Sequence, residues 1–255
     1  MPNARDLTTT ALLLACLCLA PACGGGKQSK IAPPSVQQQL RAAQSYLKAG
    51  RISDALETVA TAIETEPDNP SLYHYRGLIY FRAGRYEEAE VAFRKALEID
   101  TYYTDSHNYL GVVYTEMGRP LDAELEYKVA LKDPTYPSPE KVHLNLALLY
   151  SDQGREEDAL RNFRKSVELN PKYWHGHFEL ASFLEGQGKL DEAAREYEVA
   201  RPDYAGSGDF HYRLGLTYFR LGNLVKAEEH LRRVVEFLPG SEMAVNSTEL
   251  LKTMH

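Results

Sequence analysis

The chain has 255 residues, of which 44% are hydrophobic and 25% are charged, and its formal net charge is −7. This composition is ordinary for a folded body. The mild acidity, with no basic stripe along the sequence, disfavours nucleic acid as a partner. All three cysteines (Cys16, Cys18 and Cys23) precede residue 24, so the rest of the chain offers neither a disulfide nor a nucleophilic thiol.

The N-terminus carries an apolar run over residues 11–20, which is too short to span a bilayer and has the length of a signal-peptide core. Ala20-Pro21-Ala22-Cys23 follows this run, and three glycines come next. This segment resembles the lipobox of bacterial lipoproteins. The resemblance implies that residues 1–22 are a lipoprotein signal peptide and that Cys23 carries the lipid.

Two alternatives stay open for the leader. Leu13-Leu14-Ala15-Cys16 is a competing match, although it would leave a hydrophobic core of only a few residues. A plain secreted or uncleaved segment is the other. Gly24 stands where many inner-membrane lipoproteins have aspartate, so the resemblance implies the periplasmic face of the outer membrane as the location.

Residues 23–35 join the leader to the rest of the chain and are rich in glycine, lysine and proline. Such a composition cannot build a core and predicts a flexible tether. A coil of this length has a root-mean-square reach of roughly 20 Å. We therefore expect the lipidated Cys23 to hold the folded body close to the membrane while leaving it free to reorient.

From residue 36 onward the sequence repeats itself. Six glycines are spaced by 34, 34, 36, 34 and 34 residues and each is followed five residues later by alanine; they are Gly50, Gly84, Gly118, Gly154, Gly188 and Gly222. Small residues recur seven positions before each glycine, and large apolar residues recur four before and nine after it. This pattern predicts stacked pairs of amphipathic helices, with the glycine ending the first helix of each pair.

The segment from Gly77 to Ala96 and its equivalent from Leu110 to Ala130 resemble the tetratricopeptide repeat. The resemblance implies an all-α fold, a right-handed α-solenoid of six repeats with a C-terminal capping helix. The expected repeats span residues 36–69, 70–103, 104–139, 140–173, 174–207 and 208–241, and the capping helix spans residues 242–255. The third repeat contains a proline-rich connection over residues 132–140, which we expect to separate two halves with different binding surfaces.

Four histidines stand eleven residues before successive glycines: His107, His143, His177 and His211. A shared metal is disfavoured, because neighbouring helix axes lie about 8–10 Å apart whereas zinc ligands lie about 2.0–2.3 Å from one ion. We expect these rings to pack between hairpins. The sequence also has no nucleophile elbow and no phosphate-binding loop. An enzyme, a metal site, a cofactor and a small-molecule substrate are therefore not expected.

The first helices of such repeats line a concave wall, and residues ten, six and three before each glycine share one helix face. This face predicts a groove for an amphipathic helix or an added strand of a partner protein. The alternative is that its residues pack against the adjacent hairpin. The apolar members of the expected groove are Leu40, Leu47, Leu78, Phe81, Val112, Leu144, Leu148, Phe178, Tyr212, Leu216 and Phe219.

A lipidated leader, a short tether and six repeats resemble, in size and in order of parts, the pilotin lipoproteins of type IV pilus systems. The resemblance implies that the protein binds subunits of the outer-membrane secretin, promotes their assembly into the pilus pore, and is needed for pilus-driven motility. Two other functions fit the same scaffold: it could recruit peptidoglycan enzymes, or it could be a subunit of the machinery that assembles outer-membrane barrels.

Overall fold

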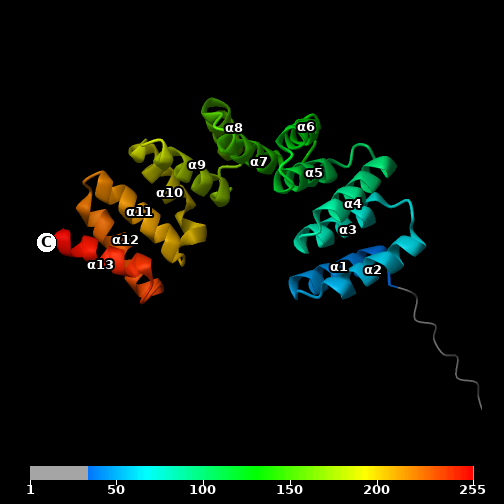
Figure 1. The fold of residues 1–255 in the computed structure, drawn as a ribbon, viewed down its shortest axis with the longest axis horizontal. Coiled ribbons are helices and arrows are strands. Elements are labelled where there is room, and N and C mark those ends of the chain that lie inside the picture. Colours follow the sequence, from blue (N-terminus) through cyan, green and yellow to red (C-terminus); the bar gives the residue numbers. More distant parts are fainter. Residues whose placement is uncertain (1–33, 255) are drawn as a thin grey trace, which may run out of the picture. The chain divides into compact units, whose positions relative to one another are not determined.

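The computed structural model describes residues 34–254. The expected signal peptide, the lipidation site at Cys23 and most of the tether lie outside the described residues. Within that range the chain forms thirteen α-helices and no strands (Figure 1). They are α1 Val36–Lys48, α2 Ile52–Thr65, α3 Pro70–Arg82, α4 Tyr86–Ile99, α5 Thr104–Glu116, α6 Pro120–Ala130, α7 Pro139–Asp152, α8 Glu156–Leu169, α9 Trp174–Gly186, α10 Leu190–Tyr204, α11 Gly208–Arg220, α12 Leu224–Phe237 and α13 Glu242–Thr253.

The helices stack in chain order, each packing against the next, so the expected all-α solenoid with an additional C-terminal helix is confirmed. The first helices of the first five pairs also touch in succession, from α1 to α9.

A capping box begins the first helix. The Ser35 hydroxyl accepts a hydrogen bond from the Gln38 backbone N–H at 3.3 Å, and the Gln38 side chain accepts one from the Ser35 backbone N–H at 2.9 Å.

Each recurring glycine ends the first helix of a pair in the left-handed conformation, with φ between 68° and 73°. At Gly118 the backbone N–H donates to the Thr115 carbonyl (3.0 Å), and the next N–H, of Arg119, donates to the Tyr114 carbonyl (2.7 Å). These two bonds make a Schellman motif, which satisfies carbonyls at the helix end and requires a residue that tolerates positive φ. The same pair of bonds recurs at all six glycines.

Close packing inside each pair explains the column of small residues. A Cβ added to Gly77 would lie 2.6 Å from Cε1 of Phe93, a ring that is fully buried in α4. The first helix therefore lies directly against the large side chain that stands nine residues after the glycine. A larger residue at position 77 would push the two helices apart.

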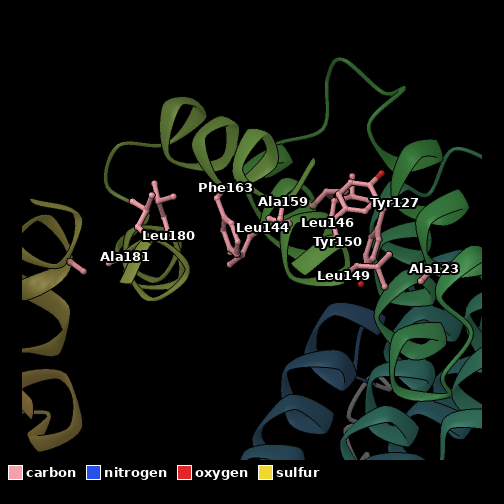
Figure 2. Close-up of a cluster of buried hydrophobic side chains, with 14 of the residues drawn as sticks. Ala123, Tyr127, Leu144, Leu146, Leu149, Tyr150, Ala159, Phe163, Leu180 and Ala181 are labelled. Atoms are coloured by element: carbon pink, nitrogen blue, oxygen red, sulfur yellow. The ribbon is translucent and has the colours of Figure 1, made fainter. Parts of the chain in front are cut away.

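Buried side chains form one continuous core from Ala89 to Ala227, part of which is drawn in Figure 2. A second, smaller cluster lies between the first pair and α3 and contains Ala43, Ala55, Val59 and Ile79. The residue eight positions before the glycine helps to explain why the two buried clusters are separate. This residue is Arg76 in α3, whereas later repeats have a buried leucine there: Leu110, Leu146, Leu180 and Leu214.

The proline-rich connection between α6 and α7 is fastened to the third pair. Tyr136 is 8% exposed, and its hydroxyl donates to Asp105 Oδ1 at 2.9 Å. The Thr104 hydroxyl donates to Asp133 Oδ2 at 2.7 Å. Because the main core runs through Tyr136 into α7, the connection joins the third and fourth pairs as packed neighbours, so it does not split the core. Whether the binding surfaces on its two sides differ stays a prediction.

Candidate partner-binding surface

Ten of the eleven side chains expected to line the groove are half-buried, and they come from α1, α3, α5, α7, α9 and α11. Leu144 is the exception. It is 2% exposed and belongs to the main core together with Phe163 of α8 (Figure 2). The expectation that Leu144 offers surface to a partner is wrong, because this side chain is buried in the main core.

Several of the half-buried residues also serve the packing of the solenoid. The Phe178 ring stacks on Tyr204 with the centroids 4.8 Å apart and the planes at 18°. Phe81 meets the edge of Tyr109 in the next repeat, with the centroids 6.4 Å apart. Tyr204 belongs to the same helix pair as Phe178, and Phe210 of the next pair lies 6.3 Å from Phe178, centroid to centroid. Both aromatic rings therefore also fill space between adjacent hairpins, as the alternative reading expects.

The sequence reasoning missed the column that stands nine residues before each glycine, which is polar or charged in four repeats (Arg41, Asn145, Glu179 and Arg213) and tyrosine in the other two. In this column Asn145 donates from Nδ2 to Asn108 Oδ1 at 3.0 Å, which joins α7 to α5. Arg213 donates from Nη1 to the Ser182 hydroxyl at 3.3 Å, which joins α11 to α9. The spacing could have revealed these residues, because they recur with the same period as the glycines. They stand one position after the residues ten before each glycine that were predicted to line the groove. These side chains add hydrogen-bonding groups to the face that carries the predicted groove residues.

A pocket of about 330 Å³ opens on this face, between α7 and α9. Its lining combines the predicted groove residue Leu148 with polar and aromatic side chains. The lining residues are Leu148, Ser151, Glu156, Phe163, Glu179, Ser182, Phe183, Gly186 and Gln187. The lining thus has three apolar and five polar side chains, and recognition sites likewise combine apolar surface with placed polar groups.

The recurring histidines do more than pack. Each Nδ1 bonds to the residue nineteen positions later, on the second helix of the same pair. The partners are Glu126 Oε2 for His107 (2.6 Å), Asn162 Oδ1 for His143 (2.9 Å), Glu196 Oε2 for His177 (2.6 Å) and His230 Nδ1 for His211 (2.8 Å). The expected packing between hairpins was therefore incomplete, because each ring bridges the two helices of its own pair.

The chemistry of this bridge differs along the stack. Around His107 both ring nitrogens face acceptors, Glu126 Oε2 and the Thr101 carbonyl. Burial lowers the pKa of His107, but the bonds to the Glu126 carboxylate and the Thr101 carbonyl outweigh it, so the pKa is raised overall. In the sixth pair burial, with a smaller contribution from neighbouring His211, lowers the pKa of His230 to about 4. The third pair therefore favours a charged imidazole and the sixth a neutral one.

No cluster of three or more histidine, cysteine, aspartate or glutamate side chains within residues 34–254 is arranged to hold a metal ion. None of the helices described there has both the length and the apolar character needed to cross a bilayer.

Sequence profiles of the tetratricopeptide repeat match residues 40–104, 144–208 and 208–241. The chain therefore belongs to the tetratricopeptide-repeat family, whose members are scaffolds for interactions between proteins.

Solved structures with the same fold include two proteins of pilus systems. The crystal structure of PilW, described as a widely conserved type IV pilus biogenesis factor, has 24% sequence identity and a TM-score of 0.71, covering 84% of this chain and 96% of PilW. PilF of Pseudomonas aeruginosa has 19% identity and a TM-score of 0.73, with the same coverage. YrrB, described as a repeat protein with an unusual peptide-binding site, has 23% identity and a TM-score of 0.57. At these identities the likeness is one of fold.

An uncharacterized protein of Haemophilus influenzae is 33% identical over 75 residues, which are 29% of this chain. The aligned segment spans 42% of the length of that relative.

Proposed function

We propose that the protein is an outer-membrane lipoprotein that binds secretin subunits and promotes their assembly into the type IV pilus pore. The observation that carries this proposal is the extent of the match to PilW and PilF. The same fold covers 84% of this chain and 96% of each of those two chains. The lipobox-like segment ending at Cys23 agrees with it, because a pore-assembly factor acts at the membrane.

The geometry suggests how such a factor works. A stack of helix pairs presents one side of its first helices as a long surface, which is mostly apolar in the first two repeats and the last and more polar between them. A secretin subunit is bound there through a helix or an extended segment. The tether after Cys23 keeps the bound subunit near the membrane, which raises its effective concentration for assembly with other subunits.

The test is deletion of the gene followed by an assay of heat-resistant secretin multimers in outer-membrane fractions. We expect the multimers to be lost and to return when the intact gene is restored. Unchanged multimers in the deletion strain would rule out a role in pore assembly. Defects confined to cell-wall enzymes or to barrel proteins would indicate one of the other scaffold functions.

A further inference from the structure

We propose that the pocket between α7 and α9 receives a lysine or arginine side chain of the bound partner. The identity of that partner rests on the proposed function, whereas the pocket's preference for a basic side chain does not. The pocket is part of the predicted groove, since Leu148 lies in its lining.

The pocket exists because two positions on α9 carry small residues. Ser182 stands six residues before its glycine, where the first repeat has Gln44 and the other four have Leu78, Val112, Leu148 and Leu216. Gly186 stands two residues before the same glycine, where the other repeats have long or charged side chains: Lys48, Arg82, Glu116, Asp152 and Arg220. Ser182 and Gly186 are one helical turn apart and share a face. A Cβ added at Gly186 would meet nothing within 4 Å, so the space beside it is open.

The walls of the pocket suit a long side chain with a charged end. Leu148 and Phe183 provide apolar surface, and the buried Phe163 ring lies behind Phe183 with the two ring centroids 5.1 Å apart. The aliphatic stems of lysine and arginine pack well on such surface while their charged ends reach a polar rim.

The rim is acidic. Glu156 and Glu179 both line the pocket, and no lysine or arginine is among its lining residues. Glu156 accepts a neutral hydrogen bond from the Gln187 amide at 3.2 Å. The carboxylate of Glu179 has a contact with His175 Nδ1 of 3.8 Å, which is too long for a hydrogen bond. Both carboxylates therefore retain capacity for a charge-assisted bond to an ammonium or guanidinium group.

The chain itself shows that a guanidinium is compatible with this edge. Arg213 of α11 donates to the Ser182 hydroxyl, which is part of the lining. Arg213 also pairs with Asp209 at 3.3 Å, so its own charge is partly compensated.

The experiment titrates the protein with N-acetyl-lysine methylamide and, separately, with its uncharged isostere N-acetyl-norleucine methylamide. Backbone amide shifts of Ser182 and Gly186 are followed by NMR. We expect saturable shifts with the lysine compound only. Ser182→Leu, which restores the residue usual at this position, should weaken its binding by about tenfold or more. Glu179→Gln should weaken it severalfold, while Glu64→Gln, the same change on an exposed part of α2, should not.

Equal binding of the norleucine compound, or wild-type binding by Glu179→Gln, would overturn the proposal. Circular dichroism checks that Ser182→Leu folds, and Glu179→Gln tests the charge independently of packing. The outcome is separable from the proposed function, because the probe needs no secretin. Binding of the lysine compound together with unchanged multimers in the deletion strain would support the pocket and refute the pilus role.

Discussion

The hydroxyl of Tyr114 donates a hydrogen bond to Glu90 Oε1, at 2.9 Å, across the seam between the second and third pairs. Arg119, directly after the turn glycine, binds the other oxygen of Glu90 at 3.0 Å and lies over the Tyr114 ring at 4.3 Å. One carboxylate thus joins a tyrosine and an arginine of the next repeat. The next seam repeats the arrangement with Glu124, Tyr150 and Arg155.

We expect Tyr114→Phe to lower the free energy of unfolding by about 1 kcal/mol or more, because it removes the hydroxyl that donates to Glu90 and accepts from Arg94 Nη2 at 2.7 Å, while keeping the ring. The measurement is urea denaturation followed by circular dichroism. Tyr80→Phe is the matched control, since Tyr80 also lies under an arginine, but its hydroxyl has no hydrogen-bond partner among the residues described. An equal loss in both variants would contradict a specific role for the hydroxyl's bonds to Glu90 and Arg94.

Gly118→Ala should destabilise the third pair by about 1 kcal/mol. The reason is backbone conformation alone, since a Cβ there would meet nothing within 4 Å and φ is +68°. Gly186→Ala is the control: this glycine is the last residue of α9, lies in open space and does not have positive φ. We expect the control to be neutral or slightly stabilising in thermal unfolding. Similar losses in the two variants would argue against conformational strain.

Acid should destabilise the sixth pair. The pKa of His230 is about 4 in the folded protein and 6.5 in the unfolded chain. The unfolded chain therefore binds more protons than the folded protein at pH values between 4 and 6.5. The free energy of unfolding therefore falls as the pH is lowered from about 6.5 towards 4, by on the order of 1–3 kcal/mol. Hydrogen exchange of α12 as a function of pH is the measurement. The charged groups facing the pair are Glu198, Arg201, Glu229 and Arg233.

The control for this pH response is His230→Glu, which installs the bridge of the third and fifth pairs. A carboxylate beside His211 raises the pKa of the histidine in the fold, so stability should then increase as the pH falls through that pKa. Loss of protection in acid that persists in His230→Glu would show that groups other than the histidine pair cause it.

Cys23→Ala should release the protein from the outer membrane, because it removes the residue expected to carry the lipid. Fractionation of cells, with immunodetection of the protein in soluble and membrane fractions, is the measurement. Glu64→Gln, a substitution at an exposed position of α2, serves as the control. Retention of the Cys23→Ala protein in the outer membrane would refute the lipid anchor.

The sequence predicted the fold because its strongest signals are local. A glycine at each turn and a small residue seven positions earlier are dictated by backbone conformation and by helix contact, and both are read from spacing alone. The Tyr114–Glu90 contact and the His211–His230 bridge were not predicted, because they depend on side chains that meet across helices. Leu144 was misplaced for a similar reason: the helix-face rule places a residue on one side of its helix, but not which neighbouring helix covers that side.

The first helix pair packs around a small core separate from the main one, which affects how the stack unfolds. Where a leucine would extend the main core, Arg76 stands with its Nε buried and without a hydrogen-bond partner in the described part of the chain. Cooperativity in a linear array depends on each interface being as strong as its neighbours. The free energy of local unfolding should therefore be lower for the first pair than for any later one. Native-state proteolysis should begin there while the other five pairs stay folded.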